Sequence, residues 1–204
     1  MNFSAEKFLN DITDHVEYYR ANPDTAFNIA EIMSDHILVT AQATRAEEIY
    51  VKGGTSADGT AINLWGDDNT LSLYGCSFAK VTENGRGGAI YVVANNTITV
   101  AIEKCAFSGN ATSGANGGAL FIGAPCTIEN CSFTDNRSTN NSGGALYIAG
   151  NGSVIRDCIF SGNYANSLDY KGGGALFLSA KCTVEDCTFS GNSAFTGANG
   201  GSGG

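Results

Sequence analysis

The sequence predicts an all-β fold, a right-handed parallel β-helix with about 27–29 residues per coil and an α-helical N-terminal cap. A Cys-x-Phe motif recurs along the chain, and its copies begin 29, 26, 27 and 29 residues apart, at Cys76, Cys105, Cys131, Cys158 and Cys187. A Gly-Gly-Ala-aliphatic motif has nearly the same period, at 87–90, 117–120, 143–146 and 173–176, with a weaker copy at 59–62. Between the motifs lie short β-rich runs separated by turn residues, and no convincing helical period follows residue 50. Two motifs in a fixed order over five periods indicate a solenoid.

The first segment, residues 1–50, is expected to form a helical cap or a docking segment, and residues 51–204 are expected to form the solenoid. Ser4 fits a helix N-cap, with Phe3 and Phe8 placed as a hydrophobic staple. Such a cap would cover the apolar end of the first coil, which otherwise invites aggregation. The alternative is a docking or targeting segment whose acidic face meets a basic partner.

Length and charge limit the function. At 204 residues the chain is long enough to bury a core, and 27 Gly against two Pro indicate many tight turns. The net charge of −9 argues against binding to nucleic acid or to anionic membranes. No apolar run approaches the ~20 residues of a membrane span. Residues 1–20 also lack the layout of a signal peptide, so either the chain stays inside the cell or its export route is not visible there.

The residues around each cysteine have expected roles. An aliphatic residue lies three positions before it: Leu73, Ile102, Ile128, Ile155 and Val184. A phenylalanine lies two positions after it: Phe78, Phe107, Phe133, Phe160 and Phe189. Strict strand alternation cannot place all three positions on one face, so a tight turn is expected just before each cysteine. The aliphatic residue, the cysteine and the phenylalanine then all point inward and stack as structural ladders.

An asparagine follows each cysteine by five residues in four coils: Asn110, Asn136, Asn163 and Asn192. These side chains are expected to stack and to satisfy turn backbone that the coils would otherwise bury. An active-site asparagine is the alternative, but one asparagine per coil favours a scaffold role. The Gly-Gly pair is expected to form a corner where a Cβ would clash. Segments between Phe-x-x-Asn and Gly-Gly-Ala vary in length and content, which places the adaptable face there.

Seven cysteines raise the alternative of a disulfide framework. Stacked cysteines would lie ~4.8 Å apart, within disulfide range, but their side chains would run parallel rather than toward each other. Cys126 and Cys182 share another position in alternate coils, with Ser153 between them. We interpret the thiols as small buried hydrophobic groups, which suits a reducing compartment or a shielded core. No cysteine–histidine cluster indicates a metal site, and no cofactor is expected.

Some β-helix proteins cleave polysaccharides with acids and bases on one outer face. The closest arrangement here is the position two before each cysteine, which holds Glu103, Glu129, Arg156 and Glu185. An exposed charge ladder explains this row more simply. No catalytic residue is therefore expected, and the protein is predicted not to be an enzyme.

An aromatic residue follows the Gly-Gly-Ala-aliphatic motif in four coils, and Asn63 has this position in the first coil; the aromatic residues are Tyr91, Phe121, Tyr147 and Phe177. Aliphatic residues flank the row on both sides and fill the interior. The row is therefore predicted to face outward as a candidate binding strip for a glycan or a protein partner. The alternative is that it packs beneath a loop such as residues 164–172.

The tandem GGA[ILV] motifs at 87, 117, 143 and 173 and the FxxN motifs at 107, 133, 160 and 189 resemble the repeats of the chlamydial polymorphic membrane proteins (Pmp) and related surface proteins. The resemblance covers about residues 59–204. It implies an extended β-helical passenger at a cell surface that acts in adhesion and has no catalytic residues.

The sequence therefore predicts a non-enzymatic cell-surface or extracellular protein, an adhesin or a structural assembly subunit, with a protein or a glycan as partner. A carbohydrate-binding or polysaccharide-cleaving β-helix protein is the first alternative. A filament-forming, intracellular protein is the second, favoured by the free thiols, and it predicts end-to-end self-association. The sequence stops where the next Gly-Gly-Ala strand is due, so the solenoid is expected to be truncated at its C-terminus.

Overall fold

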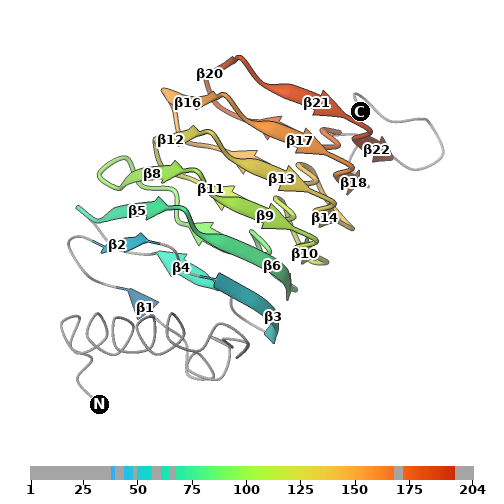
Figure 1. Ribbon diagram of the computed structural model, residues 1–204, viewed down its shortest axis with the longest axis horizontal. Helices are drawn as coiled ribbons and strands as arrows, with labels where there is room; N and C mark the ends of the chain where they lie inside the picture. The colour runs from blue at the N-terminus through green and yellow to red at the C-terminus, as the bar shows by residue number, and fades with distance from the viewer. Residues whose placement is uncertain are drawn as a thin grey trace.

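The computed structural model describes residues 38–39, 44–47, 50–56, 61–64, 68–167 and 172–195. These residues form a right-handed parallel β-helix, so the predicted fold class is confirmed. Figure 1 shows the coils stacked in chain order, from β3 near one end of the molecule to β21 and β22 near the other. The helices expected before residue 38 lie outside the described residues.

Three parallel sheets run along the solenoid, and a coil contributes strands to each of them. The first sheet has six strands: β1 (Leu38–Val39), β4 (Ile62–Leu64), β7 (Ile90–Val92), β11 (Leu120–Ile122), β15 (Leu146–Ile148) and β19 (Leu176–Leu178). The second sheet also has six: β2 (Thr44–Glu47), β5 (Thr70–Tyr74), β8 (Thr99–Glu103), β12 (Cys126–Glu129), β16 (Ser153–Arg156) and β20 (Cys182–Glu185).

The third sheet is bent by a turn in most coils. Its strands before the turn are β3 (Tyr50–Ser56), β6 (Ser77–Glu83), β9 (Ala106–Ser108), β13 (Ser132–Thr134), β17 (Ile159–Ser161) and β21 (Thr188–Ser190). After the turn come β10 (Ala111–Thr112), β14 (Arg137–Ser138), β18 (Tyr164–Asn166) and β22 (Ser193–Phe195). The long β6 pairs with both β9 and β10, so one strand of an early coil continues as two strands in the next coil.

The ladders begin before the expected domain boundary at residue 51. Strand β1 pairs with β4, with Leu38 opposite Asn63, and β2 pairs with β5, with Arg45 opposite Ser72. Both early strands fall within the range that the sequence assigned to the cap. A coil therefore lies between residue 38 and the first Gly-Thr-Ala-Ile motif, although its sequence carries neither repeat motif.

A left-handed residue makes the turn that the cysteine spacing requires. The residue before each cysteine has a φ between 51° and 64°: Gly75, Lys104, Asn130, Asp157 and Asp186. This conformation lets the chain reverse its alternation, so that the aliphatic residue and the cysteine point to the same side. The prediction of a tight turn at this position is confirmed.

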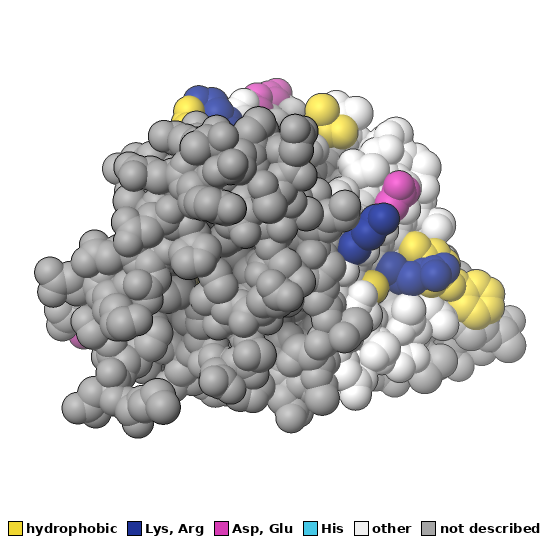
Figure 2. Space-filling view, turned by 60° about the horizontal axis from the view of Figure 1, so that its bottom comes forward, with side chains coloured by type: hydrophobic (Ala, Val, Ile, Leu, Met, Phe, Trp, Pro, Cys, Tyr) yellow, Lys and Arg dark blue, Asp and Glu magenta, His cyan; other side chains and the backbone are white. Residues whose placement is uncertain are grey.

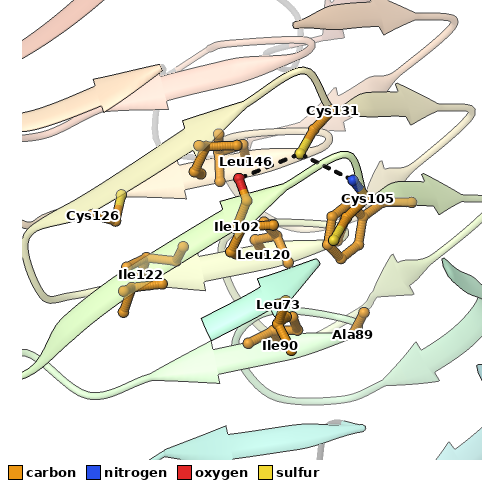
Figure 3. Packing of buried hydrophobic residues seen from close by; sticks show 14 of the residues in the cluster. Leu73, Ala89, Ile90, Ile102, Cys105, Leu120, Ile122, Cys126, Cys131 and Leu146 are labelled. Carbon is orange, nitrogen blue, oxygen red and sulfur yellow. Dashed lines mark hydrogen bonds between the residues drawn. The ribbon is translucent and has the colours of Figure 1, made fainter. Parts of the chain in front are cut away.

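The interior is a continuous stack of aliphatic, thiol and phenyl side chains (Figure 3). Phe78, Phe107, Phe133 and Phe160 are almost fully buried, and neighbouring rings lie 4.8–5.1 Å apart in parallel. In the last described coil, the residues at the equivalent aliphatic and phenylalanine positions are exposed to solvent: Val184 is 36% exposed and Phe189 is 47% exposed. No strand of the described residues stacks on the outer side of β20 or β21, which explains the difference.

Candidate functional site

The four aromatic residues of the candidate strip lie in register on the first sheet. Tyr91 is opposite Phe121, Phe121 is opposite Tyr147, and Tyr147 is opposite Phe177. The aliphatic neighbours of Tyr91, Phe121 and Tyr147 on both sides are fully buried in the interior. Because side chains alternate along a strand, the aromatic residues project from the outer face. We call the four residues the aromatic strip.

The rings of the aromatic strip stack on one another. Phe121 and Tyr147 have centroids 4.9 Å apart with a 6° interplanar angle, and Tyr147 and Phe177 are 5.1 Å apart at 11°. Tyr91 is tilted by 39° against Phe121 at 5.4 Å. Neighbouring rings therefore cover each other's faces. The ring edges are therefore the parts of these side chains that a partner would meet.

Arg86 covers part of the aromatic strip. Its guanidinium carbon lies 5.2 Å from the centroid of Phe121, and Nη1 donates a hydrogen bond of 3.5 Å to the Tyr91 hydroxyl. Together with the two neighbouring rings, this guanidinium leaves Phe121 only 7% exposed. The sequence reasoning missed Arg86, although it is the only charged residue directly before a Gly-Gly pair of the repeat.

Asn63 ends the aromatic strip in the coil that precedes Tyr91. It lies opposite Tyr91 in the ladder between β4 and β7. Its Oδ1 atom is buried and accepts no hydrogen bond from the residues that the structure describes. The apolar part of the row therefore covers four coils, from Tyr91 to Phe177.

The charged row lies in register on the second sheet, as its spacing requires. Glu129 is opposite both Glu103 and Arg156, and Arg156 is opposite Glu185. Arg156 Nη2 donates to Glu129 Oε1 at 2.6 Å, and this hydrogen bond raises the pKa of Arg156 above its usual value. Glu103 is paired with Lys104 at 3.3 Å. The row therefore contains one ion pair between successive coils, Glu129 with Arg156, and a second pair to a neighbouring lysine, which suits a surface charge ladder.

The four asparagines form a hydrogen-bonded ladder inside the turn. The Oδ1 of Asn136 accepts both the backbone N–H and the side-chain amide of Asn110, each at 3.0 Å. The Nδ2 of Asn136 donates to the Phe107 carbonyl and to Asn163 Oδ1. Asn163 and Asn192 repeat this pattern one coil further. The residue before each of the four asparagines has a positive φ, and so does Lys80 in the coil where Val81 replaces the asparagine.

Each stacked thiol caps the turn that precedes it. The Sγ atoms of Cys76, Cys105, Cys131, Cys158 and Cys187 donate to the carbonyl two residues earlier, at 3.1–3.4 Å. Figure 3 shows Cys131 between the Ile102 carbonyl and the Cys105 amide, 3.6 and 3.4 Å away. None of these five cysteines forms a disulfide. The sequence reasoning assigned them to packing alone and missed these hydrogen bonds.

The remaining two cysteines lie in a second interior row. Cys126 and Cys182 flank Ser153 in successive coils, and the Cys126 amide donates to Ser153 Oγ at 3.2 Å. Burial raises the pKa of the Cys126 thiol to about 12. Cys182, in the last described coil, is less buried, and burial raises its thiol pKa also.

We expect two thiols to react quickly in the native protein and the other five only after unfolding. Cys182 and Cys187 are partly exposed, whereas the other five are buried, so a reagent in solution cannot reach their thiol groups. A pKa of about 12 also keeps Cys126 protonated, and hence unreactive, when the pH rises from 8 to 10. Timed labelling with a disulfide reagent, followed by mass spectrometry, measures this. Cys187→Ser should remove one fast thiol, and more than two fast thiols in the native protein would contradict the expectation.

In the part of Figure 2 that is not grey, basic side chains lie beside hydrophobic ones, with few acidic side chains among them. Within the described residues, His, Cys, Asp and Glu side chains form no group of three or more that is arranged to hold a metal ion. In the same part of the chain, no helix has the length and apolar character needed to cross a membrane.

The stacked coils, the interior ladders and the three parallel sheets define a solenoid scaffold with side chains displayed in rows. The family described as a right handed beta helix region matches residues 88–201, which is more than half of the 204 residues. The chain therefore belongs to the right-handed β-helix family. Neither the curated proteins nor the solved structures compared with the chain gave a match.

Proposed function

We propose that the protein is a non-enzymatic adhesin or structural assembly subunit at a cell surface, and that it binds its partner along the aromatic strip. The alignment of four outward-facing aromatic residues in four successive coils is the main support. A regular scaffold with a continuous aromatic row gives a partner a long apolar contact in a defined direction. The resemblance to surface-displayed repeats points the same way.

The ring geometry favours a protein over a glycan as the partner. A sugar usually meets an aromatic ring face to face, but neighbouring rings at 4.9–5.4 Å cover the inner faces of the strip. Ring edges and hydroxyl groups suit contact with side chains and backbone of another protein. The charged row supports a carbohydrate-cleaving function less well than the aromatic strip supports binding, because Glu129 and Arg156 are already paired with each other.

Tyr147→Ala is expected to weaken binding to intact cells by about tenfold, because it removes a central ring and uncouples Phe121 from Phe177. Labelled protein is titrated onto cells before and after trypsin treatment, and onto a glycan array. Trypsin-sensitive binding that Tyr147→Phe restores would support the proposal. Thr127→Ala, on the outer face of the second sheet, is the matched control.

Unchanged binding by Tyr147→Ala would exclude the strip as the binding site. Binding only to the glycan array would favour the carbohydrate-binding alternative. Sedimentation velocity of the same preparations tests the assembly form of the proposal. The exposed Phe189 and Phe195 of the last described coil are the apolar groups that end-to-end association would bury.

A further inference from the structure

Arg86 gives the aromatic strip a positive charge at one end. It is exposed, it lies over the Phe121 ring, and its Nη1 contacts the Tyr91 hydroxyl. Arg86 forms no ion pair with any side chain that the structure describes. A guanidinium that contacts an aromatic ring and bonds to a neighbouring hydroxyl group is already oriented, so binding a carboxylate with its remaining N–H groups costs little side-chain entropy.

The ring edges add to this positive character. An aromatic ring has a negative face and a positive edge, and stacking in the aromatic strip hides faces and presents edges. The chain as a whole carries a net charge of −9. Arg86 and the ring edges therefore form a local site for a negatively charged group on a protein that otherwise repels polyanions.

We propose that the aromatic strip binds an extended peptide segment of a partner protein, with one carboxylate on Arg86 and apolar side chains on the edges of Tyr147 and Phe177. This inference rests on the proposed function and names the chemistry of its partner. Among the described residues, Arg86 is the one cation that lies over a ring of the aromatic strip, which matches a single carboxylate. An acidic polysaccharide or a polyacidic peptide instead brings one charge per unit. Three coil spacings of ~4.8 Å give the strip a length of about 14 Å, close to four residues of extended chain.

The charge preference is measured with short labelled peptides in a fluorescence anisotropy titration. The probes are acetyl-Asp-Val-Leu-Val-amide, its Asn counterpart and acetyl-tetra-Asp-amide, with trigalacturonic acid as a competitor. The Asp peptide is expected to bind at least tenfold more tightly than the Asn peptide, and tetra-Asp and trigalacturonic acid should bind more weakly than either. Arg86→Gln should make the Asp and Asn peptides bind equally, and Arg86→Lys should retain part of the preference.

Arg137→Gln is the matched control, because the guanidinium carbon of Arg137 also lies over an aromatic ring, 4.7 Å from the centroid of Tyr164, but on the third sheet. It should leave the preference for the Asp peptide unchanged. Tyr147→Ala should weaken both peptides by a similar factor, since apolar contacts are lost in both.

Three results would overturn the inference: equal binding of the Asp and Asn peptides, a preference that survives Arg86→Gln, or tighter binding of trigalacturonic acid than of the Asp peptide. Failure of the broader proposal has a different signature. If the peptide preference is absent but Tyr147→Ala still weakens binding to cells, the strip remains the adhesive site and only the anionic peptide is excluded. If Tyr147→Ala leaves cell binding unchanged, the proposed function itself fails.

Discussion

Phe133→Ala is expected to lower the free energy of unfolding by about 3–5 kcal/mol, the usual cost of removing a buried phenyl ring. Phe133 is fully buried, between the rings of Phe107 at 5.0 Å and Phe160 at 4.8 Å. The neighbouring coils are held in position by the hydrogen bonds of their strands and of the asparagine ladder. The gap is therefore expected to stay open rather than to close by collapse.

Phe189→Ala provides the matched comparison, because Phe189 occupies the same position one coil beyond Phe160. Among the described residues it stacks on the ring of Phe160 alone, at 4.8 Å, and it is 47% exposed. We expect about half the loss seen for Phe133→Ala, or less. Urea unfolding followed by circular dichroism compares the two variants. Equal losses of free energy would show that a second stacked ring and full burial add little to the contribution of one phenylalanine.

The interior was predictable because its pattern repeats in every coil. Strand alternation would place the aliphatic residue and the cysteine of each coil on opposite faces, so a turn between them was required. The residue before the cysteine has the left-handed φ that makes this turn. The alternation around Tyr91 and Tyr147 likewise placed the aromatic residues outside. Each of these inferences needed only the strand period and the positions that copies share.

Features that depend on contacts between coils were harder to predict. The thiols donate to carbonyl groups two residues earlier, a role that serine or threonine commonly fills in turns, and cysteine gave no such signal. The coil that starts at Leu38 carries no motif, so only the strand pairing reveals it. The exposure of Val184 and Phe189 depends on what packs against the last described coil, and the repeat pattern does not predict this.

Arg86 shows why the candidate site was only partly predictable. The sequence placed the aromatic strip on one outer face, but the position of a long, flexible side chain depends on its surroundings. Arg86 leaves the loop before Gly87 and lies over a ring of the following coil, 35 residues later in the chain, at Phe121. Its position before the Gly-Gly pair was a visible departure from Asn116 and Ser142 in the next two coils.

Gly144→Ala is expected to lower the free energy of unfolding by about 4 kcal/mol or more, or to prevent folding. A Cβ at Gly144 would lie 2.6 Å from the carbonyl carbon and oxygen of Tyr164, and it would also overlap the carbonyl oxygen of Gly174. All of these atoms are backbone, and the Gly144 amide is itself bonded to the Gly173 carbonyl at 3.0 Å. No flexible side chain is available to move, so the whole corner between two coils must shift.

Gly152→Ala separates this steric effect from the general cost of replacing glycine. Gly152 has a φ of 82°, but no atom lies within 4 Å of the position its Cβ would take. Its substitution should cost only the left-handed strain, about 1–2 kcal/mol. Soluble yield and urea unfolding of both variants test the comparison. If Gly144→Ala lowers the free energy of unfolding no more than Gly152→Ala does, the expected clash between the new Cβ and the backbone of the next coil does not occur. The second glycine of the repeat would then serve the chain through its flexibility rather than through its size.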